Sequence, residues 1–600
     1  MKPWFLRDMQ RLSLEREAIK RLEETAEWLK GTDWVFGDGL CVDAIIRAHG
    51  HDYQVRLSYP ALFPFAPPVV RPKNPNERWS SHQYLNGTLC LEWGPDTWHP
   101  DVTGAQVLES VYKLLYIENP FGSDEHKVAP SRHHFSIGQT LRDIYGRFYA
   151  GDKLSSYLAT LPPQAVGSVE FLIQWQSKSF LVLIQKIRSI GMQPWEDISL
   201  PQGVRASEDK GILRAGIFYK TGLDCEIINR INSAKEIEDT LNRVGYRVVS
   251  FSNDEIDPAM GLKRPPFGIL LLDSTDKPHF FILFDPNKDK VLQLAPVQSE
   301  NDGVLSRTPT DLQELSGKSV GIVGLGSVGS KLAISLARMG VSRFFLIDED
   351  IFLPENVCRH VLDWQNIGEH KVDAIAEILH RIAPNIEVDV SHLHLTGQES
   401  TASLRGALNR LGLCDLLIDA TADSHVFNLM AAVATTYEKP LVWGEVYAGG
   451  IGGMIARSRP GRDPDPHSMR AVYNHFTSEI QDPRVRVADD YTAESNAGDI
   501  VSASDADVSI LAYHAARLAI DTLLKREPSI FPYSMYLIGL ARSWIFKAPF
   551  DTIPIATDHL LQKQSSDPLT DEGLSNNVEF LTNLIKKTKA DAGNWYKEKQ

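Results

Sequence analysis

The sequence is poor in cysteine and has no cysteine pair of the CxxC kind. Only five cysteines occur in 600 residues, and they are scattered at positions 41, 90, 225, 358 and 414. An odd, scattered set of this kind excludes a disulfide framework and a four-thiolate zinc site. It is typical of a reducing compartment, so we expect a cytoplasmic protein.

Long apolar runs and excess positive charge are also missing. No apolar stretch reaches the 18 residues that indicate a membrane-spanning helix, and residues 1–30 lack the apolar core of a signal peptide, so we expect no membrane partner. The formal net charge of −15 disfavours nonspecific nucleic-acid binding, which needs a basic surface. With 43% hydrophobic residues, the chain is long enough for three or four domains.

Changes of pattern along the chain predict an α/β multidomain protein. A charged helix over 1–30, strand-like alternation over 34–70 and helices over 102–116 and 137–149 predict an α+β domain spanning 1–163. Residues 164–310 combine short apolar strands with one helix over 234–244, and we expect an α+β spacer there, without a catalytic motif. A Rossmann-like domain over 311–560 and a helical tail over 561–600 follow.

A glycine-rich loop opens the third domain. The apolar strand 319–323 leads into Gly324-Leu325-Gly326-Ser327-Val328-Gly329 and then into a helix over 330–339. Glycines at a helix N-terminus let the backbone approach phosphates. Asp348 ends the next strand, at the spacing where an acid meets ribose hydroxyls. Gly324, Gly326, Gly329 and Asp348 are therefore candidate nucleotide ligands, for ATP or for NAD.

The residues beyond Asp348 favour a triphosphate. Asn356 and Arg359 lie in N-V-C-R-H, and Lys371 lies in G-E-H-K-V. Arg359 and Lys371 are spaced to supply cations to the β- and γ-phosphates, which a hydride-transfer cofactor does not need. The alternative interpretation is that both are surface charges.

This order of segments resembles the ubiquitin-activating enzymes and the bacterial enzymes that adenylate sulfur-carrier proteins. Those families share a D-x-D-x-V, N-x-x-R-Q and G-x-x-K-V order and a later D-A-T-D segment, which is similar to residues 419–423 here. The resemblance implies a ThiF-type adenylation domain, ATP and Mg²⁺ as cofactors, and a homodimer. It implies Asp423 as the Mg²⁺ ligand, with Asp419 as second choice, because Mg²⁺ prefers carboxylate oxygen.

Activating enzymes that form a thioester have an acceptor cysteine in the loop before a late helix, so the resemblance implies one at the corresponding place here. Here that helix is expected over 503–524 with Asp505 as its N-cap, and the loop 489–500 contains no cysteine. Ala493 stands where the cysteine is expected, and Ala497 is the second candidate. Either the adenylate passes directly to another thiol, or alanine replaces the acceptor cysteine in this chain.

A second motif surrounds Cys90. The segments F-P-F-A-P-P-V over 63–69, N-G-T-L-C-L-E over 86–92 and W-H-P over 98–100 occur in that order. This order resembles the ubiquitin-conjugating enzymes and implies that Cys90 is an acyl-carrying nucleophile. Where that family has His-Pro-Asn, this chain has Ser80-Ser81-His82, so His82 becomes the candidate hydrogen-bond donor or base beside the thioester. The alternative is a buried structural thiol.

Taken together, the two motifs resemble the fused activating-and-conjugating enzymes of bacterial CBASS antiphage systems. That family implies ATP-dependent activation of a protein C-terminal carboxylate and its transfer through Cys90 to a target amine. The implied acyl donor is the C-terminus of a cGAS-like nucleotidyltransferase, and the target is unknown. Two other interpretations remain. One is a sulfur-carrier adenylyltransferase with a non-catalytic front domain, and the other is an NAD-dependent oxidoreductase, which Arg359 and Lys371 disfavour.

Overall fold

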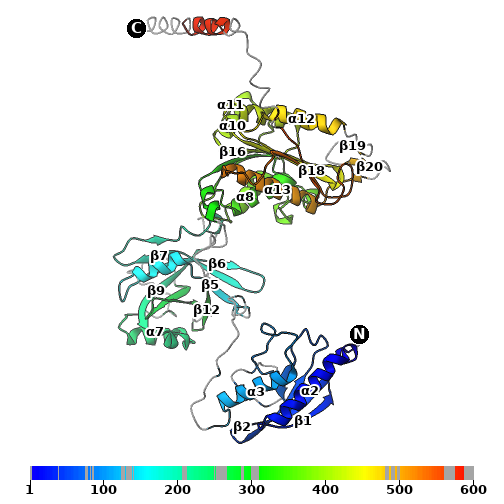
Figure 1. Ribbon diagram of the computed structural model, residues 1–600. Helices are drawn as coiled ribbons and strands as arrows, with labels where there is room; N and C mark the ends of the chain where they lie inside the picture. Colours follow the sequence, from blue (N-terminus) through cyan, green and yellow to red (C-terminus); the bar gives the residue numbers. More distant parts are fainter. Residues whose placement is uncertain are drawn as a thin grey trace. The chain divides into compact units, whose positions relative to one another are not determined.

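The computed structural model divides into two units, Met1–Asp143 and Ile144–Gln600, and each is described by itself (Figure 1). The second unit contains a middle domain and a C-terminal domain. The residues that the structure describes are 3–37, 39–74, 77, 79, 80, 83, 87–122, 129, 138, 141, 142, 144–205, 213–248, 251, 266–284, 289–298, 310–479, 485–487, 493–495, 500–557, 559 and 575–586.

The first unit is an antiparallel meander with helices packed on it, as the sequence predicts. Its sheet has the order β1-β2-β3-β4, and α2 and α3 pack together beside it. Glu15 of α2 is fully buried and accepts hydrogen bonds from the Tyr59 hydroxyl at 2.8 Å and the Gly104 amide at 2.7 Å, so it ties α2 to the start of α3. The elements are α1 Trp4–Arg7, α2 Met9–Thr25, β1 Leu29–Phe36, β2 Leu40–Ala48, β3 His51–Ser58, β4 Val69–Pro72 and α3 Gly104–Glu118.

The middle domain is built on a sheet that closes on itself. The strand order is β5-β12-β11-β10-β9-β6-β7-β8, and β5 also pairs with β7, so seven strands form a ring. Helices α6 and α7 cover one part of it. The elements are β5 Gly146–Tyr149, α5 Asp152–Thr160, β6 Val166–Trp175, β7 Phe180–Ser189, β8 Trp195–Glu196, β9 Arg214–Leu223, α6 Cys225–Asn229, α7 Ala234–Arg243, β10 Gly268–Asp273, β11 Pro278–Leu283 and β12 Val291–Val297.

The first predicted domain boundary, at residue 163, is wrong. Strand β5 and helix α5 belong to the middle domain, where Phe148, Leu154 and Leu158 are buried in one core with strands β6 and β7. Residues 146–149, which were expected at the end of a helix over 137–149, are extended. A strand of four residues has too short an alternation to be recognised, and its partners lie far away in the sequence.

The C-terminal domain has the predicted Rossmann-like architecture. Its sheet has the order β15-β14-β13-β16-β17-β18-β22-β23, in which the first five strands are parallel and the last three antiparallel. The elements are β13 Ser319–Val323, α8 Ser327–Arg338, β14 Arg343–Ile347, α9 Lys371–Leu379, β15 Glu387–Ser391, α10 Thr401–Leu413, β16 Leu416–Asp419, α11 Ser424–Thr436, β17 Leu441–Val446, β18 Gly452–Ser458, α12 Pro466–Glu479, β19 Val485–Val487, β20 Ala493–Ser495, β21 Ile500–Val501, α13 Asp505–Leu523, β22 Met535–Gly539 and β23 Thr552–Pro554.

Two apolar cores lie on the two faces of this sheet. Helices α8, α9 and α13 contribute to one core, and α10, α11 and α12 contribute to the other (Figure 1). The strand order 3-2-1-4-5 of the parallel part reverses between β13 and β16. In open α/β sheets a ligand binds at the carboxyl ends of the strands where the order reverses.

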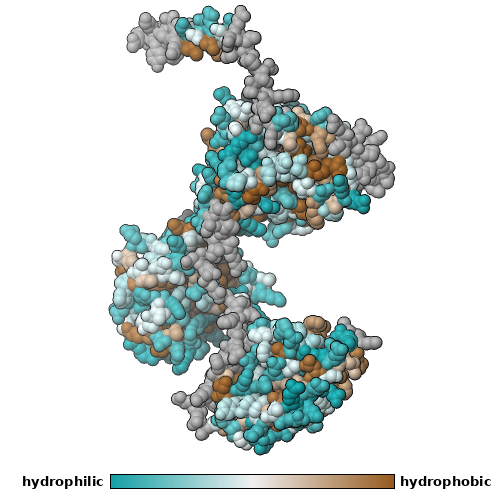
Figure 2. Space-filling model, in the orientation of Figure 1, coloured by the Kyte–Doolittle hydropathy of each residue, from teal (hydrophilic) through white to brown (hydrophobic). Residues whose placement is uncertain are grey.

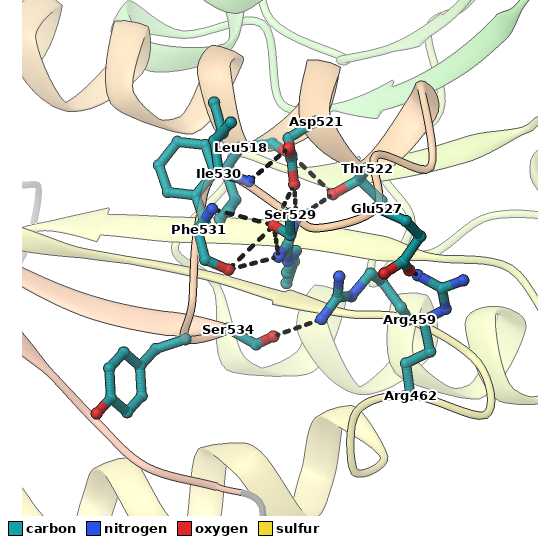
Figure 3. A network of polar contacts seen from close by, with 12 residues as sticks. Arg459, Arg462, Leu518, Asp521, Thr522, Glu527, Ser529, Ile530, Phe531 and Ser534 are labelled. Carbon is teal, nitrogen blue, oxygen red and sulfur yellow. Dashed lines mark hydrogen bonds and ion pairs between the residues drawn. The ribbon is translucent and has the colours of Figure 1, made fainter.

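A buried ion pair fixes the C-terminal end of α13 against the sheet. Arg457 of β18 lies 2.6 Å from Asp521 and also donates to the Ser529 hydroxyl at 2.8 Å and the Phe531 carbonyl at 3.1 Å. Figure 3 shows Asp521, Thr522, Ser529 and Phe531 converging on this point. Both charges are almost fully buried, so removal of one partner leaves an uncompensated charge, at a cost of about 3–5 kcal/mol.

In the predicted C-terminal tail, the structure contains a helix over 575–586 whose residues are all exposed (Figure 2). Its apolar side chains are Val578, Phe580, Leu581, Leu584 and Ile585. In the part of the chain that the structure describes, no helix has both the length and the apolar character needed to cross a membrane.

Candidate active site

A cavity of about 380 Å³ lies at the carboxyl ends of the parallel strands in the C-terminal domain. It gathers seven of the predicted nucleotide ligands, which come from five separate segments of the chain. These are Gly324, Gly326, Asp348, Asn356, Arg359, Lys371 and Asp423. The eighth, Gly329, is not part of the lining.

The glycine loop connects β13 to α8 and places the N-terminus of α8 at the cavity. Gly324 has φ +86°, a conformation that favours glycine, and a side chain there would also meet Thr421 at 2.8 Å. A Cβ at Gly329 would lie 1.8 Å from the Gly324 carbonyl oxygen, so Gly329 allows α8 to pack against the loop. Gly326 is the N-cap of α8, and both it and Ser327 line the cavity. The N–H groups of a helix N-terminus favour an anion at such a place.

Asp348 holds the loop as well as lining the cavity. Its Oδ2 accepts a hydrogen bond from the Leu325 amide at 2.5 Å, and its Oδ1 accepts one from the Asp350 amide at 2.9 Å. Burial raises the pKa of Asp348, and these two backbone hydrogen bonds oppose the shift. The carboxylate therefore fixes the position of the glycine loop relative to β14, in addition to its predicted place beside a ribose.

His360 supports the same loop from the other side. Its Nε2 donates to the Leu325 carbonyl at 2.7 Å, and its Nδ1 accepts from the Leu362 amide at 3.1 Å, which defines a neutral ring. Burial lowers the pKa of His360 to about 4. The sequence shows His360 where the related motif has glutamine, but its hydrogen bond to the loop could not be foreseen.

The two cations that the sequence proposed for the phosphates both line the cavity. Lys371 is the first residue of α9, and its Nζ lies 2.6 Å from Oδ2 of Asp350. Arg359 is half-buried, and its carbonyl oxygen accepts a hydrogen bond from Lys331 at 2.5 Å. Asn356 accepts a hydrogen bond from the Leu353 amide at 3.0 Å, so its side chain also shapes the turn that carries Arg359.

Lys331 was not predicted as part of the site. It is 4% exposed, and besides Arg359 its Nζ contacts Oδ1 of Asp505 at 2.9 Å. Asp505 was expected to cap α13, but the N-cap is Ser504, whose hydroxyl accepts from the Asp507 amide. The available signal in the sequence was the charge itself, because Lys331 is the one charged residue in the first half of the helix, over residues 327–332.

Asp423 and Asp419 differ in what they can bind. Asp423 is exposed and caps α11 through Oδ1, which accepts from His425 at 2.6 Å and Val426 at 3.0 Å. Its Oδ2 has no hydrogen-bond partner within the described residues, so it can serve a Mg²⁺ ion bound to phosphates. Asp419 is 4% exposed, accepts a hydrogen bond from the Thr421 hydroxyl and does not line the cavity. Burial also raises the pKa of its carboxyl group. The geometry therefore favours Asp423.

In the first unit Cys90 follows Leu89, which forms an isolated antiparallel bridge with Gln83. Of the predicted turn over 86–87, the described residues include only Gly87, whose φ is +86°. Cys90 is half-buried between the buried Leu89 and Leu91. The segment is held by the Leu89 amide, which donates to the Val70 carbonyl at 2.9 Å, and by the Glu92 amide, which donates to Ser110 at 2.8 Å. His82 lies outside the described residues.

The predicted acceptor position has a different backbone from the one expected. Ala493 begins strand β20 of a small sheet ordered β19-β20-β21, in which it pairs with Val487 and Val501, whereas a loop was predicted. Strands of only two or three residues carry too little periodicity to be recognised, which explains the error. Ala497 lies outside the described residues.

Comparison with protein families assigns two of the domains. Residues 300–528 match the ThiF family, and residues 167–298 match the domain observed between E2 and E1 domains. These matches agree with the expected α/β multidomain fold and its C-terminal ThiF-type domain.

Individual relatives cover smaller parts. The chain is 31% identical to the ATP-dependent ubiquitin transferase-like protein Cap2 of Pseudomonas aeruginosa over 143 residues, which is 22% of this chain and 23% of Cap2. It is 29% identical to the uncharacterized protein y4qC of Sinorhizobium fredii over 64% of this chain and 67% of that protein. It is 30% identical to the ubiquitin-like modifier-activating enzyme 5 of Culex quinquefasciatus over 25% of this chain and 39% of that enzyme. The chain therefore contains a ThiF-family domain over residues 300–528, preceded by the domain observed between E2 and E1 domains, and it is similar to Cap2 over a stretch of 143 residues.

Proposed function

We propose that the C-terminal domain uses ATP to activate the C-terminal carboxylate of a protein, and that Cys90 transfers the acyl group to a target amine. One observation carries the proposal. The glycine loop, Arg359, Lys371 and Asp423 line one cavity at the reversal point of a ThiF-family sheet. The similarity to a ubiquitin transferase-like protein and to a ubiquitin-like modifier-activating enzyme supports the same chemistry.

In the first step a carboxylate oxygen attacks the α-phosphorus of ATP, and pyrophosphate leaves. The N-terminus of α8 and the glycine-loop amides bind the phosphates. Arg359 and Lys371 neutralise negative charge on the leaving pyrophosphate, and they act in a partly enclosed cavity where such charges interact strongly. Asp423 would hold Mg²⁺, which supplies further positive charge at the phosphates.

In the later steps a thiolate attacks the adenylate carbonyl and AMP leaves, after which the acyl group moves between thiols by exchange. The thiolate, not the thiol, is the nucleophile. Cys90 then releases the acyl group to an amine, which forms an amide and frees the thiolate. We assign His82 as a donor to the developing oxyanion in that last step. Two routes lead to Cys90: its thiolate attacks the adenylate directly, or a thiol at position 493, where this chain has alanine, captures the acyl group first and passes it on by exchange.

The remaining assignments follow from resemblance. We propose that the acyl donor is the C-terminus of a cGAS-like nucleotidyltransferase, that the system is CBASS antiphage defence, and that the activating domains pair as a homodimer. The match to the domain between E2 and E1 domains supports conjugation over sulfur-carrier chemistry.

Exchange of labelled pyrophosphate into ATP tests the proposal. We expect the exchange to need Mg²⁺ and a protein or peptide with a free C-terminal carboxylate. Arg359→Ala should reduce exchange about 10- to 100-fold, because a charge-assisted hydrogen bond contributes about 1.5–3 kcal/mol. The matched control is Arg405→Ala, since Arg405 is exposed on α10 away from the cavity lining. Tight NAD binding without ATP binding would contradict the proposal.

A further inference from the structure

One carboxylate in the nucleotide cavity has no role in the steps described above. Glu445 lies near the end of β17, and it lines the cavity together with Val446 and Tyr447. It is the one charged residue in the strand Leu441–Val446. An acid here repels an anionic triphosphate, so this end of the cavity suits a different ligand from the end that holds Arg359 and Lys371.

Two tyrosines fix the position of this carboxylate. The Tyr473 hydroxyl, which comes from α12, donates a hydrogen bond to Oε1 of Glu445, and it lies 3.1 Å from the Tyr447 hydroxyl. Tyr473 is 7% exposed. Burial and the nearby Glu445 raise the pKa of Tyr473, and burial raises the pKa of Tyr447, so both hydroxyls keep their protons at neutral pH.

The second oxygen of Glu445, whose side chain lines the cavity, is unpaired among the described residues. Its Oε2 accepts no hydrogen bond from any residue that the structure describes, and it is not among the fully buried atoms without a partner. Within the described residues, the result is a carboxylate that Tyr473 orients through Oε1 and whose Oε2 remains available as an acceptor. Such an arrangement suits an N–H donor, because a hydrogen bond to a charged acceptor is stronger than one between neutral groups.

The walls around Glu445 limit the shape of that donor. Tyr447, Val446 and Val508 are apolar neighbours in the lining, and Tyr447 packs edge-on against Trp544 at 5.4 Å between ring centroids. At Gly450 a Cβ would meet Asp507 at 2.3 Å, so the chain after β17 lies directly against the first turn of α13. An apolar wall with one fixed acceptor matches an extended peptide backbone.

We propose that Oε2 of Glu445, held by Tyr473, accepts a backbone N–H from the C-terminal segment of the acyl donor and thereby selects which carboxylates reach the α-phosphate. This inference rests on the proposed adenylation function, in which Glu445 would recognise the acyl donor. Glu445 contacts the donor but takes no part in bond making, so its loss should affect donor binding more than turnover.

Glu445→Gln is the variant that tests this inference. With Tyr473 still donating to Oε1, the amide presents an NH₂ group where the carboxylate presented an acceptor, at nearly the same size. The probes are short synthetic peptides with free carboxylates and randomised final residues, assayed by pyrophosphate exchange in the full chain. The best peptide is then remade with an ester in place of each of its last amide groups in turn, which removes one N–H at a time.

We expect Glu445→Gln to raise the KM for the peptide about 10- to 100-fold while leaving the KM for ATP within about twofold. One ester peptide should show the same high KM with the unchanged protein, and Glu445→Gln should weaken it no further. Tyr473→Phe should produce a smaller rise in the same KM. The control Glu438→Gln changes an exposed acid after α11 and should change neither constant.

Three results would overturn the inference. An unchanged peptide KM in Glu445→Gln would remove Glu445 from donor recognition. A higher Mg²⁺ requirement without a change in peptide KM would make Glu445 a metal ligand instead. The third result is absence of exchange by the unchanged protein with every peptide, which would refute adenylation itself and this inference with it. If the unchanged protein does catalyse exchange, the first two results concern Glu445 alone.

Discussion

The Nζ atom of Lys331 lies 2.9 Å from Oδ1 of Asp505 and 2.5 Å from the carbonyl oxygen of Arg359. One buried ammonium group thus connects helix α8, the turn that carries a cavity cation, and the first turn of α13. Helix α13 follows the segment in which an acceptor thiol was expected. Lys331 therefore links the turn beside the cavity to the helix that follows that segment.

Lys331→Met should weaken ATP binding although Lys331 does not line the cavity. Without the ammonium group, Arg359 loses the contact that fixes its backbone, and we expect a lower affinity for ATP and a loss of about 1–3 kcal/mol in stability. Calorimetric ATP titration and thermal unfolding check the two effects. Asp505→Asn, which keeps the Arg359 contact, should change ATP affinity less. Equal effects of both variants would contradict the role of the Arg359 contact.

The stability of the C-terminal domain should fall as the pH decreases from about 6.5 to about 4. Burial, helped by the charges of Lys371 and Lys331, lowers the pKa of His360 to about 4 from 6.5. The unfolded chain therefore binds the proton first, and the contribution of the neutral ring, about 3 kcal/mol, is fully present above pH 6.5 and lost toward pH 4. Urea unfolding at several pH values measures this slope.

His360→Gln is the matched control for that slope. Glutamine can donate to the Leu325 carbonyl and accept from the Leu362 amide, but it does not titrate. We expect this variant to fold and to show a flatter dependence between pH 6.5 and pH 4. An unchanged slope would assign the acid sensitivity to other groups.

Cys90→Ala should abolish conjugate formation and leave pyrophosphate exchange unchanged. Cys90 belongs to a separate unit from the nucleotide cavity, so its thiol has no part in adenylation. A gel assay with acyl donor and amine target measures conjugation. Cys225→Ala removes an exposed thiol of the middle domain as a control and should have no effect. Full-rate conjugation by Cys90→Ala would exclude the first unit from catalysis.

Ala493→Cys should create a thioester that reducing agents cleave. An adenylate is exposed to hydrolysis, and a nearby thiol converts it to a longer-lived acyl carrier. Ala497→Cys tests the alternative position. A thioester with Ala497→Cys alone would show that Ala493 is misplaced, and no thioester with either variant would indicate direct transfer to Cys90. Non-reducing gels with and without thiol reductant distinguish these outcomes.

The sequence predicted which residues line the cavity better than it predicted the contacts that support them. Asp348, Asn356 and Arg359 could be placed together because the carboxyl ends of parallel strands meet at one edge of the sheet. The contacts of Lys331 and Tyr473 could not be predicted, since each joins segments that are distant in sequence. Lys331 reaches Asp505 of α13, and Tyr473 reaches back from α12 to Glu445 of β17.

The middle domain shows the same limit at the level of strands. Its strands β6, β7 and β11 and helix α7 appeared in the sequence as local patterns, whereas β5 did not. Phe148 packs against Phe280 of β11 at 6.0 Å between ring centroids, and β5 pairs with β12 and β7, all of which lie further along the chain. Pairings over such distances leave no periodic signal in a single sequence.

Strand β5 also determines where the chain can be divided. It fills the gap between β7 and β12, and it is encoded before every other strand of that ring. A polypeptide beginning at residue 164 would therefore expose two unpaired strand edges, and such edges pair with other chains. Separation after Asp143 keeps the ring intact, so the short strand protects the middle domain from self-association.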